Sequence, residues 1–162
     1  MFKFNDMKRF LFLLFFVAAV LGVNAQDKKV AISGAYASSF QEGEAAARAI
    51  DGNTATIWHS AYSGSGTSFP VTYTINLKEV SHVDYLRYTP RQDGTPNGNW
   101  NEVDLSYAAT TNSSTFTKIG TYKLGGSSAV YDFTIPDGGV ECGRVRFTIK
   151  SGANGYASAA EI

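Results

Sequence analysis

The chain has 162 residues and a balanced charge, with 14 Lys and Arg against 14 Asp and Glu. That balance excludes the basic patch of a nucleic-acid-binding protein, so we expect no nucleic-acid partner. Cys142 is the single cysteine, which excludes a disulfide within the chain, and we expect it as a buried thiol on a strand.

Residues 1–25 have the three parts of a secretory signal peptide. Lys3, Lys8 and Arg9 form a positive start, 10–21 is an apolar run, and small residues precede Gln26. The alternative is a membrane anchor, but this run is short of the roughly 20 residues that a spanning helix needs. We therefore expect an exported protein, in the periplasm, at the cell surface or outside the cell. Residues 26–162 form one domain with 11 basic and 13 acidic side chains.

Hydrophobic alternation predicts an all-β domain. A short alanine-rich stretch at 42–50 is the one helical pattern. The side chains of Val71, Tyr73, Ile75 and Leu77 fall on one face of a strand. The predicted strands are 71–77, 83–89, 103–107, 116–122, 130–135 and 145–149, with turn-forming clusters at 63–68, 92–99, 124–128 and 136–139. This spacing indicates a sandwich or barrel.

The sequence stops two residues after Ala160. In a sandwich we expect a strand to follow Glu161, so we predict that the last strand is truncated. We also expect that this chain is a fragment, or the first module of a longer protein.

Oxygen-bearing side chains cluster in the turn at Asp51, Asn53 and Thr56, and Glu161 adds a carboxylate from the far end. Oxygen ligands of this kind suit a hard cation such as calcium better than zinc. The alternative is an ordinary Asp-Gly turn in which Asp51 accepts hydrogen bonds from its own backbone.

Three motifs in order resemble a known family. They are Asp-Gly-Asn-x-x-Thr-x-Trp-His-Ser at 51–60, Leu-Arg-Tyr-Thr-Pro-Arg at 86–91, and Gly-Tyr-Ala-x-Ala-Ala-Glu-Ile at 155–162. Together they resemble the discoidin-type domain, also called the coagulation factor type C domain, and most of all the family-32 carbohydrate-binding modules. The resemblance runs from residue 31 to 162. It implies an eight-stranded antiparallel jelly-roll β-sandwich, a structural calcium ion and sugar binding by loops at one end.

The resemblance also implies residue roles. Calcium ligands would come from the side chains of Asp51, Thr56 and Glu161 and from the carbonyl groups of Arg48, Asn53 and Ala160. A sugar needs an aromatic platform and planar hydrogen-bonding groups. The candidate sugar ligands are Glu42, His59, Tyr62, Arg91, Asn97 or Asn99, and Tyr156. We place Trp58 and Trp100 in the core and expect His59 to point outward, since neighbours on a strand alternate. The alternative for each polar residue is an ordinary solvated side chain.

These residues predict a non-catalytic module that binds galactose- or N-acetylgalactosamine-terminated glycans. No catalytic motif is present, although a linked catalytic or binding domain beyond residue 162 fits the family. The alternatives are a discoidin-type adhesion domain for protein or lipid headgroups, and a structural spacer. The loops at 63–68 and 92–97 are polar, so we do not expect membrane binding.

Overall fold

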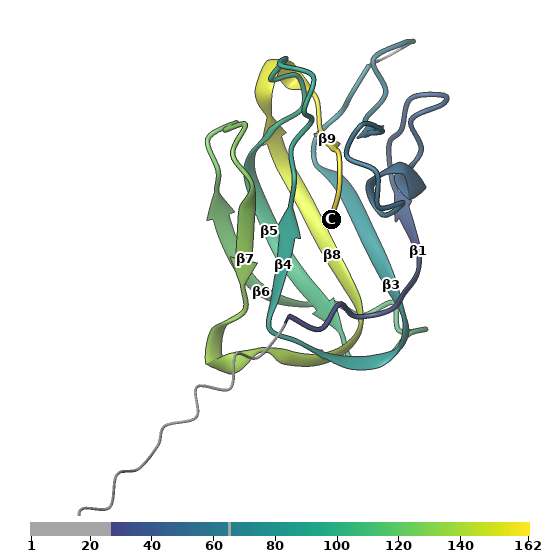
Figure 1. Cartoon of the computed structure of the whole chain (residues 1–162), viewed down its shortest axis with the longest axis vertical. Coiled ribbons are helices and arrows are strands. Elements are labelled where there is room, and N and C mark those ends of the chain that lie inside the picture. The colour runs from purple at the N-terminus through teal and green to yellow at the C-terminus, as the bar shows by residue number, and fades with distance from the viewer. Residues whose placement is uncertain (1–26, 65) are drawn as a thin grey trace, which may run out of the picture.

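A computed structural model describes residues 27–64 and 66–162, so the predicted signal peptide lies outside the described residues. One layer is a five-stranded antiparallel sheet in the order β1-β3-β8-β5-β6 (Figure 1). Its strands are β1 (Ile32–Ala37), β3 (Val71–Val83), β5 (Trp100–Ala108), β6 (Thr117–Lys123) and β8 (Val140–Gly152).

The second layer consists of two short pairs in front of that sheet (Figure 1). In one pair, β2 (Trp58–His59) lies against β9 (Ser158–Ala159), and in the other β4 (Tyr85–Tyr88) lies against β7 (Tyr131–Thr134). A β-bridge between Thr89 and Glu161 connects the two pairs. The predicted antiparallel β-sandwich is confirmed.

Three short 3-10 helices connect the strands. They are η1 (Ala46–Ala49), η2 (Pro136–Gly138) and η3 (Ala153–Gly155). The alanine-rich stretch at 42–50 forms only η1, which has no side-chain hydrogen bond at its N-terminal cap. In the described part of the chain, no helix is long and apolar enough to cross a bilayer.

The predicted strands are all present, but β3, β5 and β8 are longer than the alternation indicated. Three further strands were not predicted: β1, whose sequence ISGAYA does not alternate cleanly, and the two-residue strands β2 and β9. Residues 158–162 themselves pair with β2 and with Thr89, and the strand expected after Glu161 stays a prediction.

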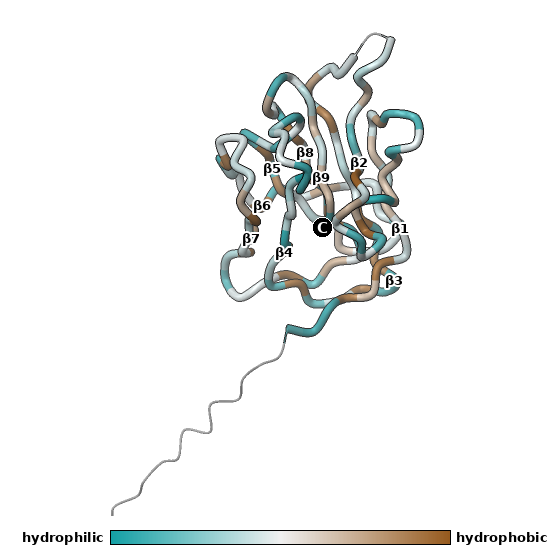
Figure 2. The backbone as a smooth tube through the Cα atoms, turned by 45° about the horizontal axis from the view of Figure 1, so that its top comes forward, coloured by the Kyte–Doolittle hydropathy of each residue, from teal (hydrophilic) through white to brown (hydrophobic). Residues whose placement is uncertain are grey.

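The core lies between the layers and is rich in aromatic side chains. Figure 2 shows the hydrophobic stretches along the strands, with polar loops between them. The predicted inner face of β3 is confirmed, because Val71, Tyr73, Ile75 and Leu77 are all buried. The Tyr88 and Trp100 rings stack with their centroids 4.0 Å apart.

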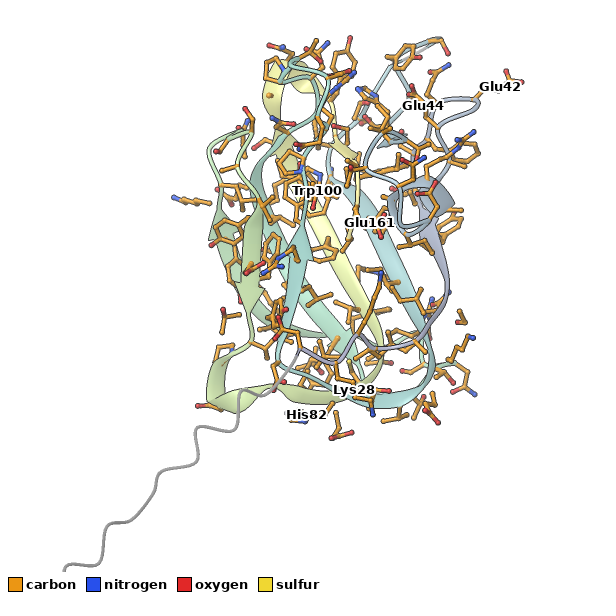
Figure 3. The ribbon with its side chains drawn as sticks, viewed as in Figure 1. Lys28, Glu42, Glu44, His82, Trp100 and Glu161 are labelled. Atoms are coloured by element: carbon orange, nitrogen blue, oxygen red, sulfur yellow. The ribbon has the colours of Figure 1, made fainter. Side chains whose placement is uncertain are left out.

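Three other core predictions hold. Trp58 and Trp100 are fully buried, and Figure 3 shows Trp100 between the layers. Cys142 is a buried free thiol, and burial raises its pKa to about 11. A thiol with so high a pKa is almost entirely protonated near neutral pH, which suits a packing role.

Phe147 tests how much this aromatic core stabilises the fold. It is fully buried on β8, and its ring centroid lies 5.1 Å from those of both Trp100 and Phe133. We expect Phe147→Ala to lower the free energy of unfolding by about 3–5 kcal/mol, because a cavity replaces the ring. Urea unfolding measures the loss. Val130→Ala, at a half-exposed side chain, should change stability by less than about 0.5 kcal/mol. Similar values for both variants would contradict this account of the core.

Candidate functional site

Strand β9 brings the far end of the chain beside the segment that carries His59. Trp58 pairs with Ala159 and His59 pairs with Ser158. The Ser60 N–H donates to the Ala157 carbonyl at 2.7 Å, and the Ile162 N–H donates to the Ala49 carbonyl at 2.8 Å. The contact between residues 49–60 and 157–162 is called the seam below. The candidate sugar ligand His59 and the candidate calcium ligands Asp51 and Glu161 therefore all lie along it.

His59 is buried, with 4% of its surface exposed, so the expectation that it points outward was wrong. The alternation argument fails here because aromatic side chains from two loops cover the ring. The Tyr62 centroid lies 5.1 Å from that of His59, and the Tyr156 centroid lies 5.3 Å away. Tyr62 itself is half exposed. The three rings form an aromatic surface at one end of the sandwich.

The His59 ring has one nitrogen committed to the backbone. Its Nδ1 lies 2.6 Å from the Ser60 carbonyl oxygen, which can only accept a hydrogen bond. Nδ1 therefore carries the hydrogen. In the neutral ring, Nε2 is then left as an acceptor for a ligand hydroxyl.

The two nearby glutamates have different environments. Glu42 lies in an exposed turn, and Figure 3 shows its side chain extending away from the molecule. Glu44 accepts a hydrogen bond from the His59 N–H through its carbonyl oxygen, at 3.2 Å. Its carboxylate oxygen Oε2 is buried with no hydrogen-bond partner among the described residues. Glu44 is therefore a second candidate beside the predicted Glu42, whose role stays a prediction. Sequence gave no signal for this choice, because both residues flank the same turn.

Arg91 is held in place by its neighbours. Nε donates to Asp93 Oδ1 at 2.9 Å, Nη2 donates to the other Asp93 oxygen, and Nη1 donates to the Asn97 carbonyl at 3.3 Å. The Arg91 guanidinium holds the pKa of Asp93 well below its usual range. Each terminal nitrogen of Arg91 retains a second hydrogen for a ligand.

The loop at 97–99 joins Arg91 to β9. The Asn97 carbonyl also accepts from Ser158 Oγ at 2.9 Å, and the Asn97 side chain accepts from Asn154. Gly98 has φ +86°, and a Cβ there would lie 2.6 Å from Ser158 Oγ, so only glycine fits. Asn99 is fully buried, and neither polar atom of its amide has a partner within the described residues.

The predicted sugar ligands are thus brought together in part. His59, Tyr62 and Tyr156 meet, and Arg91 and Asn97 connect to them through Ser158. Glu42 is exposed in the turn next to Gln41, whose N–H donates to the His59 carbonyl at 2.8 Å. Sequence reasoning missed Gln41, whose Oε1 accepts from the N–H groups of Tyr62 and Ser63 and fixes the loop that carries Tyr62.

The predicted calcium ligands bring several oxygen atoms close to the Thr56 hydroxyl. Thr56 Oγ1 lies 2.7 Å from Asp51 Oδ2, 2.8 Å from the Asn53 carbonyl oxygen and 3.3 Å from the Arg48 carbonyl oxygen. One hydroxyl hydrogen can serve only one of these acceptors well. Four oxygen atoms therefore converge with too few hydrogens between them.

Glu161 joins this oxygen cluster from the C-terminal segment, two residues after the end of β9. Its Oε2 accepts from the Gly52 N–H at 3.1 Å, across 109 residues of sequence. Its Oε1 is buried with no hydrogen-bond partner in the described residues, although the exposed Lys29 ammonium lies 3.8 Å away. Crowded oxygens and an orphaned carboxylate oxygen fit a hard cation.

The negative charge of this cluster affects the buried Tyr73 in the core. Burial raises the pKa of Tyr73, and the carboxylates of Glu161 and Asp51 raise it further. The Tyr73 hydroxyl donates to the Ala46 carbonyl at 2.7 Å, next to the turn. In the described residues, no group of three or more His, Cys, Asp or Glu side chains is arranged to hold a metal ion by itself, so backbone and hydroxyl oxygens would complete any metal shell.

Comparison with known proteins gives the class of this domain. The model of the F5/8 type C domain matches residues 34–162. The chain therefore belongs to the F5/8 type C domain family, as the sequence motifs predicted.

Solved relatives have the same fold. The family 32 carbohydrate-binding module of NanJ from Clostridium perfringens, solved with galactose, is 28% identical with a TM-score of 0.70, covering 78% of this chain and 88% of that chain. A family 32 module solved with GalNAc-β-1,3-galactose, also from Clostridium perfringens, is 27% identical with a TM-score of 0.72, covering 78% and 90%.

Two curated relatives are much longer proteins. Galactose oxidase from Gibberella zeae is 46% identical over 72 residues, which are 42% of this chain and 10% of that protein. An A type blood N-acetyl-α-D-galactosamine deacetylase from Flavonifractor plautii is 31% identical over 122 residues, 72% of this chain and 14% of the relative. The chain spans a small fraction of the length of each.

The Asp51 turn should make stability depend on pH. Hydrogen bonds from the Thr56 hydroxyl and the Asn53 N–H lower the pKa of Asp51 from its usual 3.8. The folded state then holds the carboxylate ionised more strongly than the unfolded chain does. This contribution is present above pH 3.8 and is lost as the pH falls through the folded pKa.

Comparison of Asp51→Asn with the unchanged protein in metal-free buffer measures this effect. We expect the variant to be less stable at pH 6, with a difference that shrinks below about pH 4. Urea unfolding at each pH gives both values. A difference that stays constant down to pH 2.5 would contradict the assigned hydrogen bonds.

Proposed function

We propose that the domain is a non-catalytic carbohydrate-binding module for glycans that end in galactose or N-acetylgalactosamine. The observation that carries the proposal is the buried His59 ring, with Nε2 left as an acceptor, between the Tyr62 and Tyr156 rings. The solved relatives in complex with galactose and with GalNAc-β-1,3-galactose support it.

Each group has a role in holding a sugar. Tyr62 and Tyr156 offer aromatic faces to the C–H side of the ring. His59 Nε2 accepts from one hydroxyl, while the remaining N–H groups of Arg91 donate to the same or a neighbouring hydroxyl. Glu44 is the candidate for a further acceptor through its other carboxylate oxygen, because Oε2 is enclosed by protein. A sugar hydroxyl both donates and accepts. An acceptor such as His59 Nε2 beside a donor such as Arg91 therefore fixes where that hydroxyl binds.

The proposed site is shallow. A hollow of about 960 Å³ lies elsewhere among the described residues and is lined by 27–32, β3, β4 and Ile162. A site that grips one or two sugars on a surface should bind with about −4 to −6 kcal/mol, which is millimolar to tens of micromolar. We propose that this exported module acts within a larger protein, where several weak sites raise retention.

Isothermal titration of residues 26–162 with galactose and N-acetylgalactosamine tests the sugar site. We expect His59→Ala and Arg91→Ala to weaken binding at least tenfold, since each removes a hydrogen bond made to a fixed group. Glu44→Gln should weaken it more than Glu42→Gln does. Glu79→Gln, on an exposed residue of β3, is the control for charge and should bind normally.

The opposite order for the two glutamates would return the acceptor role to Glu42. Absence of binding to any galactose-type glycan on an array, by a folded protein in calcium, would contradict sugar recognition. The adhesion alternative would then gain support.

We propose further that a calcium ion binds the oxygen cluster at the seam. Asp51 and Glu161 supply carboxylates, Thr56 supplies its hydroxyl, and Arg48, Asn53 and Ala160 supply carbonyl oxygens. An ion among these oxygens would replace their mutual repulsion with attraction and satisfy Glu161 Oε1. Its role would be structural, because it ties residues 48–56 to the C-terminal segment.

Chelation tests this ion. We expect EDTA to lower the melting temperature, and added calcium to restore it, because a ligand bound only to the folded state stabilises it. Magnesium should restore less, since it demands near-octahedral geometry. Glu161→Gln should weaken the response to calcium, whereas Glu141→Gln, an exposed residue at the start of β8, should respond like the unchanged protein. An identical melting temperature with EDTA and with millimolar calcium would refute the ion.

A further inference from the structure

The outer face of the five-stranded sheet carries two arginines that the proposed function does not use. Arg144 and Arg146 lie two residues apart on β8, so their side chains share one face of the sheet. Arg146 lies between Thr74 on β3 and Ser106 on β5. Arg144 lies between Asn76 and Ala108 in the next row.

Neither arginine forms a salt bridge with any described residue, although other basic residues do. Arg87 pairs with Asp132, and Lys118 and Lys150 both contact Asp104 on this same outer face. The two lysines thus occupy the carboxylate that the arginines would otherwise approach. Burial, followed by the charge of Arg144, lowers the pKa of Arg146, which fits two cations held together without a counter-ion.

Neutral groups fix both guanidiniums in place. Arg146 Nε donates to Thr74 Oγ1 at 3.0 Å, and its Cζ lies 3.7 Å from the centroid of the Phe116 ring. Arg144 donates from Nε to Asn76 Oδ1 at 2.8 Å and from Nη1 to the Ser113 carbonyl at 2.7 Å. Both terminal nitrogens of Arg146, and Nη2 of Arg144, keep their hydrogens for another acceptor.

The loop that carries Phe116 and Ser113 is itself packed tightly on β8. A Cβ at Gly143 would lie 2.1 Å from the backbone nitrogen of Thr111, so the loop touches the strand where no side chain fits. The arginines are therefore pre-organised, and a ligand would meet little ordering cost.

We propose that this face is a second binding site, for an acidic polysaccharide whose carboxylate or sulfate groups are held by the forks of Arg144 and Arg146. A guanidinium matches such an oxyanion with two parallel hydrogen bonds, and more strongly than neutral donors do. The site lies on the layer opposite β2 and β9, so it acts independently of the His59 site.

The surroundings favour a polysaccharide over other polyanions. Partly exposed hydroxyl groups flank the arginines, from Thr72, Ser106 and Thr148. Tyr36 on β1 is 65% exposed and stands in the same cross-strand row as Thr74 and Arg146, two strand spacings or roughly 10 Å from Arg146. It can receive the ring of a neighbouring sugar. A nucleic acid would call for a broader basic stripe than the balanced charge of this chain supplies.

Titration of residues 26–162 with oligogalacturonate, which offers carboxylates, and with a chondroitin sulfate oligosaccharide tests the proposal. We expect binding of at least one of them, weakened at least tenfold in the double variant Arg144→Gln with Arg146→Gln. Arg87→Gln is the control on the other layer, where one positive charge is removed instead of two, and should stay within twofold of the unchanged protein. The lysine pair Arg144→Lys with Arg146→Lys keeps the charge but loses the forks, so it should lie in between.

Two measurements keep the result independent of folding and of the His59 site. Galactose affinity and melting temperature are measured for every variant. If the double glutamine variant does not fold, Tyr36→Ala, at an exposed ring, should still weaken the acidic oligosaccharide at least threefold and leave galactose binding unchanged.

Several outcomes would overturn the proposal. One is that the protein binds neither oligosaccharide. Another is that Arg87→Gln and the double variant lose equal affinity for the acidic oligosaccharide, and a third is that the double variant keeps full affinity. Binding to phosphatidylserine vesicles without binding to the oligosaccharides would assign the face to a membrane instead.

Discussion

The structure depends on the antiparallel pairing of the last residues with the segment around His59. Backbone hydrogen bonds join Ser60 to Ala157 and Ile162 to Ala49, and the Glu161 carboxylate accepts from the Gly52 N–H across 109 residues. Without this seam, neither the crowded oxygens at Asp51 nor the rings around His59 would meet. Two strands of only two residues therefore position both candidate sites, and the strength of each site is coupled to the stability of the seam.

The aromatic core also holds the seam in place through a hydrogen bond from a buried tyrosine. The Tyr88 hydroxyl donates to the Ser158 carbonyl at 3.1 Å and accepts from the Trp100 N–H of the backbone at 3.3 Å. One buried phenol thus joins β9 to the strand that begins after the 97–99 loop. Its ring stacks on Trp100, so packing fixes the position of the hydroxyl. Burial raises the pKa of Tyr88, which keeps the hydroxyl protonated and able to donate throughout the physiological range.

Sequence reasoning succeeded where apolar residues alternate along one strand. It failed where a strand or a buried side chain depends on backbone from a distant part of the sequence. The alternation of Val71, Tyr73, Ile75 and Leu77 predicted a buried face, since period-2 burial is local information. The two-residue strands β2 and β9 exist only because of each other, and no local pattern announces them. The prediction that His59 points outward failed for the same reason, because one of the two rings that cover it, Tyr156, comes from 97 residues further along the chain. The choice between Glu42 and Glu44 also needed the backbone bond from His59 to Glu44.

A net charge near zero conceals two separated regions of opposite sign. Asp51 and Glu161 hold negative charge at the seam, where Arg48 lies in the same turn but contributes its carbonyl oxygen to the cluster. Arg144 and Arg146 hold positive charge on the outer sheet, where Asp104 is already engaged by two lysines. At the seam the Lys29 ammonium lies 3.8 Å from Glu161 Oε1, whereas neither arginine has a carboxylate partner among the described residues. The two proposed ligands, a cation at the seam and an oxyanion on the sheet, would each bring the opposite charge to one of these regions.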